Sequence, residues 1–212
     1  MPSSSWKVLK SASVPPSTSE LSDGFTINAP VGTDLWETPG TPPVFNCPMI
    51  YRSMPLVSFR RARVTVTANI ESPYAQGGLA LIIHRADGTR AWVKTGVEFM
   101  NGEQLVCTVG KDQAPDWSPG STIPQQEPGD RKREVTIEMV REETGLAVFE
   151  ISAGCEPGTE KRKVIRELAW VFSVASNEHV ECWVGAYAAK PLGNENEGYL
   201  VVKLRGLVVD GH

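Results

Sequence analysis

The chain has 212 residues, of which 41% are hydrophobic, and a formal net charge of -4 at pH 7. A chain of this length can bury a sizeable core without disulfides or metal ions. We therefore expect one domain over residues 1–212, with its core at about 25–209. The acidic balance gives no overall attraction for phosphates, which argues against a nucleic-acid partner.

No run of about 18 apolar residues is present, and the first residues lack an apolar leader, so we expect neither a membrane span nor secretion. The four cysteines are far apart, with no CxxC pair, and the chain has no Asn-x-Ser/Thr site. They are Cys47, Cys107, Cys155 and Cys182. This spacing favours reduced, buried thiols and a cytoplasmic protein.

Short, β-branched apolar stretches bounded by Gly, Pro, Asn or Asp recur along the chain, whereas helical periodicity is nearly absent. About ten strands are predicted, which indicates two packed antiparallel sheets. The predicted strands are Phe25–Asn28, Ala62–Ile70, Leu79–His84, Trp92–Phe99, Leu105–Val109, Val135–Arg141, Leu146–Ile151, Leu168–Val174, Cys182–Ala188 and Leu200–Val209.

Two turn sequences connect three of these strands in order. Ala86-Asp87-Gly88-Thr89 follows His84, and Asn101-Gly102 follows Phe99, so the Trp92–Phe99 strand is predicted to lie in the middle of a meander. The segment Lys111–Arg133 is rich in proline and is expected to be a surface loop that covers a sheet face.

The most function-like feature is the middle strand of this meander. Alternation puts Trp92, Lys94, Gly96 and Glu98 on one face, where the glycine leaves open space between two opposite charges. Such a face can form the wall of a ligand cleft. Further polar and aromatic candidates lie in four other stretches: Asp34 and Trp36, Tyr74 and Gln76, Asp116 and Trp117, and Trp183 and Tyr187.

These residues allow more than one interpretation. Lys94 and Glu98 are about 13 Å apart along a strand, so each needs another partner, which is a cross-strand ion pair or a ligand. The tryptophans can pack in the core or stack on a flat ligand, with Trp117 the best ligand candidate because its context is polar. Lys94, Glu98 and Asp116 are the candidate catalytic residues, and Glu98 with Asp116 is the one carboxylate pair worth testing for glycosidase chemistry.

Metal and cofactor signals are weak. The three histidines His84, His179 and His212 have no zinc-ligand spacing, and no loop has the dense Asp/Asn pattern of a calcium site. The Gly77-Gly78 pair is not followed by a helix signal, so a phosphate site is not expected there. We expect no metal and no cofactor.

A set of short motifs in this order resembles the regulation-of-enolase family in its fungal form, a domain of unknown function with a concanavalin A-like sandwich. The motifs are Ala29–Trp36, Tyr51–Ser53, Phe59–Val64, Gln76–Leu79, Trp92–Glu98, Asp116–Ser118 and Val184–Tyr187. The resemblance implies a jelly roll of two antiparallel sheets, one of them concave. It supplies no catalytic residue set, and the family name links it to the control of enolase.

Three functions remain open. The leading hypothesis is a non-catalytic cytoplasmic protein that binds a small molecule or a protein partner on the concave sheet and has a regulatory role. The second is a lectin-like carbohydrate-binding module. The third is a metal-independent isomerase or cyclase in which Lys94 or Glu98 transfers a proton or stabilises charge.

Overall fold

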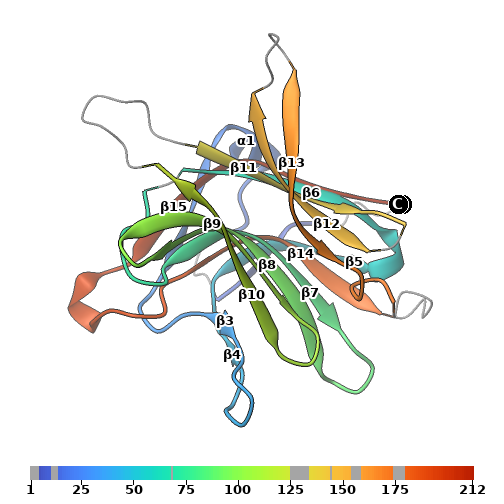
Figure 1. Ribbon diagram of the computed structural model, residues 1–212, viewed down its shortest axis with the longest axis horizontal. Coiled ribbons are helices and arrows are strands. Elements are labelled where there is room, and N and C mark those ends of the chain that lie inside the picture. Colours follow the sequence, from blue (N-terminus) through green and yellow to red (C-terminus); the bar gives the residue numbers. More distant parts are fainter. Residues whose placement is uncertain are drawn as a thin grey trace.

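The computed structural model describes residues 5–10, 14–67, 69–124, 134–143, 145–153, 159–173 and 180–212. They form two antiparallel sheets that pack face to face, together with a small two-stranded sheet (Figure 1). The sequence therefore predicted the fold class correctly. No helix in this described part is long and apolar enough to cross a membrane.

The first sheet has seven strands and includes the predicted meander. In spatial order its strands are β1 (Lys7–Leu9), β5 (Met49–Pro55), β14 (Glu181–Ala189), β7 (Gln76–His84), β8 (Arg90–Met100), β9 (Glu103–Lys111) and β10 (Pro115–Ile123). Strands β7, β8 and β9 are consecutive neighbours, so the strand that carries Lys94 and Glu98 has hydrogen-bonded partners on both sides.

The second sheet has six strands, again all antiparallel. In spatial order they are β13 (Glu160–Leu168), β12 (Leu146–Ala153), β11 (Glu134–Arg141), β6 (Phe59–Thr67), β15 (Leu200–Gly211) and β2 (Phe25–Ala29). The small sheet is the hairpin of β3 (Leu35–Trp36) and β4 (Val44–Phe45), and the helical segments are α1 (Thr18–Asp23), η1 (Leu56–Ser58) and η2 (Glu195–Glu197).

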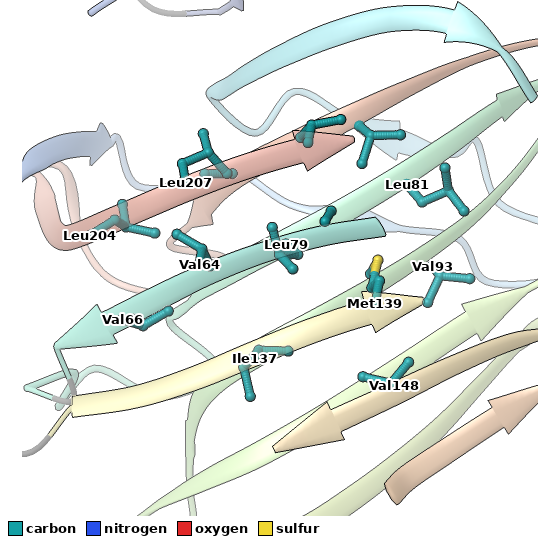
Figure 2. Close-up of a cluster of buried hydrophobic side chains, with 14 of the residues drawn as sticks. Val64, Val66, Leu79, Leu81, Val93, Ile137, Met139, Val148, Leu204 and Leu207 are labelled. Carbon is teal, nitrogen blue, oxygen red and sulfur yellow. The ribbon is translucent and has the colours of Figure 1, made fainter. Parts of the chain in front are cut away.

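The main core fills the space between the two large sheets. Alternate residues of β7 and β8 point into it and meet alternate residues of β6, β11, β12 and β15 (Figure 2). Leu79, Val93, Val64 and Ile137 each have no exposed surface. Each fully buried aliphatic side chain of this kind contributes about 1.5–3 kcal/mol, so this layer holds the sheets together.

The outer face of the seven-stranded sheet is also covered. Leu35 of the β3–β4 hairpin packs in a second apolar cluster with Ile82, Trp92 and Val109 of the sheet. Strands β7 and β8 are therefore buried on both faces along most of their length. The hairpin, which lies on the side of this sheet away from β11 and β6 in Figure 1, is what covers that face.

Two sequence predictions were wrong. The segment predicted as a long covering loop contains strand β10, which pairs with β9 and has an irregular register between Pro119 and Thr122. Proline is tolerated there because β10 is an edge strand. Residues 125–133 of the predicted loop lie outside the described part of the chain.

The strand predicted at Leu168–Val174 was also wrong. Strand β13 ends at Leu168, and residues 169–173 form turns. Their apolar character has another cause, because Val171 is fully buried and Trp170 and Phe172 pack against the core. Val174 lies outside the described residues. Strand β5, between two prolines, escaped prediction.

A close approach of two strands explains the glycines of β7 and β8. Gly78 and Gly96 are directly paired, and a Cβ atom built on Gly78 lies 2.1 Å from the carbonyl oxygen of Thr95. A Cβ on Gly96 would lie 2.1 Å from the carbonyl oxygen of Gly77. The glycine between Lys94 and Glu98 is thus required by the backbone of the next strand, and open space between two charges is not its main role.

We predict that Gly78→Ala lowers the free energy of unfolding by about 2 kcal/mol, because the added methyl group can be accommodated only if β7 and β8 move apart. Urea unfolding followed by far-UV circular dichroism measures this change. Gly102→Asn is the control, since a Cβ at Gly102 meets nothing within 4 Å and asparagine tolerates its φ of +84°. Equal stability of the two variants would refute the close-approach argument.

Candidate functional site

A cavity of about 310 Å³ lies on the outer face of the seven-stranded sheet. The sheet supplies its floor, and the segments before β3 and after β14 supply walls. Its lining residues are Asp34, Trp36, Tyr74, Gln76, Lys94, Glu98, Val109, Trp117, Pro191 and Leu192.

The floor of the cavity follows from strand register. Lys94 of β8 is paired with Val109 of β9, and Val109 is paired with Trp117 of β10, so these three side chains form a row across three strands. Glu98 lies on the same face of β8 and is paired with Gln76 of β7. Regular antiparallel pairing thus brings side chains of β7, β8, β9 and β10 together at the cavity floor.

A buried ion pair connects the floor to the hairpin. The Nζ atom of Lys94 lies 3.1 Å from Oδ1 of Asp34, and the Lys94 side chain is 3% exposed. The same Asp34 oxygen accepts a hydrogen bond of 2.7 Å from the backbone N–H of Leu35. The Asp34 N–H in turn donates to Oδ1 of Asn46 at 2.8 Å. Hydrogen bonds within its own loop therefore hold Asp34 in place independently of Lys94.

Two indole rings surround the Lys94 ammonium. Its Nζ lies 5.4 Å from the ring centre of Trp36 and 5.7 Å from that of Trp92. Both distances are within the range of cation–π attraction. The Lys94 charge is thus neutralised by Asp34 and stabilised further by the rings. These contacts fix the position of the ammonium group in the cavity floor.

Glu98 lacks such an arrangement. It is 7% exposed, and among the described residues it forms no ion pair. Burial raises the pKa of Glu98, while the more distant Lys94 charge and the neighbouring Cys107 and Trp117 side chains lower it in part. Desolvation dominates because a carboxylate without a close cation is poorly stabilised in a dry site.

Trp117 presents a polar group of its own. Its Nε1 atom is buried and has no acceptor at full hydrogen-bond geometry in the described structure, although the indole is close enough to Glu98 to lower that pKa. A buried donor without a good acceptor costs about 1–3 kcal/mol. This indole N–H is therefore a weak donor toward Glu98 and lacks a well-aligned acceptor.

Gln76, the remaining polar residue of the floor, is oriented by two hydrogen bonds. The Tyr187 hydroxyl donates to Oε1 of Gln76 at 2.9 Å, and Gln76 Nε2 donates to the carbonyl oxygen of Tyr74 at 3.1 Å. Burial raises the pKa of Tyr187 well above its usual range, so it stays a neutral donor. This chain of hydrogen bonds orients Gln76 and fixes the backbone of Tyr74 at the rim.

Seven of the eleven candidate ligand-binding residues line this one cavity. They are Asp34, Trp36, Tyr74, Gln76, Lys94, Glu98 and Trp117. The prediction that Lys94 and Glu98 each form a cross-strand ion pair, left open as an alternative, is wrong. Lys94 finds its partner on a loop instead, and Glu98 faces an amide across the strand.

The other four candidates lie elsewhere. Tyr187 is buried outside the cavity lining, and its hydroxyl donates to Gln76. Trp183 stacks on Tyr51 with ring centres 4.7 Å apart, outside the cavity lining. Trp92 packs under the hairpin and lines a second hollow of about 280 Å³ on the other side of Trp36.

Asp116 was predicted as a polar anchor of the site, and this is wrong. It alternates with Trp117 on β10, so it projects to the opposite face, where it pairs with Arg166. The carboxylate pair of Glu98 and Asp116 considered for glycosidase chemistry therefore does not share a cavity.

Three lining residues were not among the candidates. Val109 could have been found from the register that the Asn101-Gly102 turn sets between β8 and β9. Pro191 and Leu192 follow β14 and carry no local signal of function. No group of three or more His, Cys, Asp or Glu side chains in the described ranges is arranged to hold a metal ion.

Comparisons with solved structures give the fold. The chain superposes on a functionally unknown protein from Saccharomyces cerevisiae with a TM-score of 0.68, 19% identity, and coverage of 98% of this chain and 96% of that one. It also matches a GH43 protein from Bacillus licheniformis with a TM-score of 0.52 and 10% identity, over 85% of this chain and 32% of that one. At these identities the likeness concerns the fold alone, which is concanavalin A-like.

Sequence comparison gives the family. An uncharacterized protein of Emericella nidulans is 38% identical over 187 residues, which cover 88% of this chain and 86% of that protein. The family model described as "Protein of unknown function (DUF1349)" matches residues 12–202. The chain therefore belongs to the DUF1349 family of proteins of unknown function.

Proposed function

We propose that the protein is a non-catalytic ligand-binding protein that holds a small molecule in the cavity on the outer face of the seven-stranded sheet. The observation that carries this proposal is the convergence of Lys94, Asp34 and Glu98 within one aromatic-walled cavity. Buried charged groups are costly to maintain, and they gather where they meet a ligand.

The dimensions and lining of the cavity support a small ligand. A volume of about 310 Å³ is at the lower end of the range for small-molecule sites. Trp36, Trp117 and Tyr74 offer flat apolar surfaces, whereas Gln76 and the charged side chains offer directed polar contacts. This combination suits a compact molecule with one apolar side and a few polar groups.

A regulatory role of the regulation-of-enolase type is part of the proposal. Tyr74 and Leu192 line the cavity and are 43% and 50% exposed, so a bound ligand would alter the surface that a protein partner meets there. A cytoplasmic location is proposed as well, and three free, buried thiols at Cys47, Cys107 and Cys182 support it.

Proton transfer is the second candidate function. The observation in its favour is the raised pKa of Glu98 within a cavity, which is typical of a general acid or base. Glu98 is then the acid or base of an isomerase or cyclase, and Lys94, already paired with Asp34, stabilises charge. Turnover of a bound metabolite that Glu98→Gln abolishes would favour this function over binding alone.

We predict that Leu192→Trp blocks ligand binding. The side chain lies at the cavity and is half exposed, so a larger ring there fills the opening with little effect on stability. A metabolite and oligosaccharide library is screened by thermal shift and tryptophan fluorescence, and each hit is titrated against the variant. An affinity loss of at least about tenfold is expected.

Tyr199→Trp is the matched control, because Tyr199 is exposed, lies outside the cavity lining and receives the same new side chain. Hits that bind Leu192→Trp as well as the parent protein would place the binding site elsewhere. Hits confined to oligosaccharides would favour the lectin-like function.

We also predict that Glu98→Gln stabilises the ligand-free protein at neutral pH, by about 1 kcal/mol or more. Because the folded-state pKa of Glu98 is raised, the folded state disfavours its ionised form. The parent protein therefore loses stability as pH rises from the ordinary glutamate range through the raised pKa, and glutamine does not titrate. The gain should be smallest at acid pH, where the folded and unfolded states both bind the proton, and should grow as pH rises through the raised pKa.

Urea unfolding at several pH values measures this difference. Glu103→Gln, at the exposed first position of β9, is the control and should show no such pH dependence. A variant that is less stable than the parent at about pH 8 would show that Glu98 already has all the partners it needs.

A further inference from the structure

We infer that the cavity takes a molecule carrying one positive charge, an amine or quaternary ammonium group that lies against Glu98. This inference rests on the proposed function and adds the chemical class of the ligand. Its basis is the charge left unmatched inside the cavity: the lining holds two carboxylates, Asp34 and Glu98, and one ammonium, Lys94.

Lys94 cannot serve both carboxylates. Its Nζ donates to Oδ1 of Asp34 at 3.1 Å and lies over the rings of Trp36 and Trp92. The Asp34 oxygen is held in place by the Leu35 N–H, so the pair is fixed by the loop. Moving Lys94 toward Glu98 would leave the half-buried Asp34 carboxylate without a cation, which is unfavourable.

Other cations of the described chain near the cavity are also engaged. Lys190 precedes the lining residue Pro191, and its Nζ lies 3.3 Å from a Glu197 carboxylate oxygen. Lys111, in the neighbouring hollow beyond Trp36, lies 3.0 Å from a carboxylate oxygen of Glu37. Because these cations of the described residues are engaged, the missing positive charge is expected from a ligand.

Glu98 has no ion-pair partner among the described residues, so its carboxylate is open to a cation from a ligand. It is 7% exposed, and the groups beside it that lower its pKa by hydrogen bonding are the neutral side chains of Cys107 and Trp117. Neutral donors stabilise a carboxylate less than a cation does. A ligand cation against Glu98 would supply the charged partner that the described residues do not give it.

The walls of the cavity fit the same ligand class. Trp36, Trp117 and Tyr74 present aromatic rings to the cavity, and the face of an aromatic ring attracts a cation. The Nε1–H of Trp117, which lacks a well-aligned acceptor and lies close enough to Glu98 to lower its pKa, adds one donor beside the carboxylate. A compact amine with one oxygen satisfies each of these groups.

The test uses choline and its neutral isostere 3,3-dimethylbutan-1-ol, which share shape and hydroxyl group and differ in charge. Binding is measured by tryptophan fluorescence and calorimetry at about pH 8. Choline is expected to bind at least about tenfold more tightly than the alcohol. Glu98→Gln should abolish that preference, whereas Glu103→Gln, with a similar loss of negative charge at an exposed position, should retain it.

The pH dependence is a second readout. The preference for choline should fall as pH is lowered through the raised pKa of Glu98, because protonation removes its charge. The titratable groups that face Glu98 are Lys94, Asp34, Cys107 and Tyr187. The pKa values of the Cys107 thiol, at about 12, and of Tyr187 are raised by burial, so neither changes charge in the range used.

Equal affinities for the two probes, or a choline preference that persists in Glu98→Gln, would overturn the inference. If the alcohol binds as well as choline and Leu192→Trp blocks both, the proposed binding function stands and only the charge assignment fails. Binding of neither probe also overturns the inference, and the library screen then decides the proposed function separately.

Discussion

The ion pair between Lys94 and Asp34 is the contact on which the site depends. It joins the middle strand of the seven-stranded sheet to the segment that leads into the β3–β4 hairpin. Without it, the buried Lys94 ammonium would lack a carboxylate and the half-buried Asp34 would lose its cation, although Glu37 would still tie the same segment to Lys111 of β9. Removing one member of such a pair costs about 3–5 kcal/mol, so this contact is under strong structural constraint.

The ion pair requires that Lys94 stay in one position, and the rest of the fold provides this by making β8 rigid. Val93 and Val97 of this strand are buried in the main core, while Lys94 and Glu98 point to the other side. Backbone pairing to β7 and β9 leaves the strand no freedom to slide, since a shift of one residue would put the charges into the core. The close contact of Gly78 with Gly96 fixes the same register from within the sheet.

Local patterns predicted the part of the site that lies on one strand, and failed where distant segments meet. Period-two alternation places Lys94 and Glu98 on one face, as the structure has them. The same alternation separates Asp116 from Trp117, but the prolines of β10 predict a loop, for which alternation gives no face. Asp34 lies 60 residues from Lys94, and no local rule connects them.

Asp34 and Glu98 show why composition alone could not assign roles to two carboxylates of one cavity. Asp34 accepts from a backbone N–H and from a buried ammonium, so its charge is accounted for by the fold. Glu98 lies next to neutral groups, and burial raises its pKa. A folded chain gains nothing from an uncompensated buried carboxylate, and it could remove the cost with glutamine at no change in shape. The presence of a carboxylate at that place is therefore understandable if its compensation comes from a bound molecule, and Asp34 is the structural member of the two.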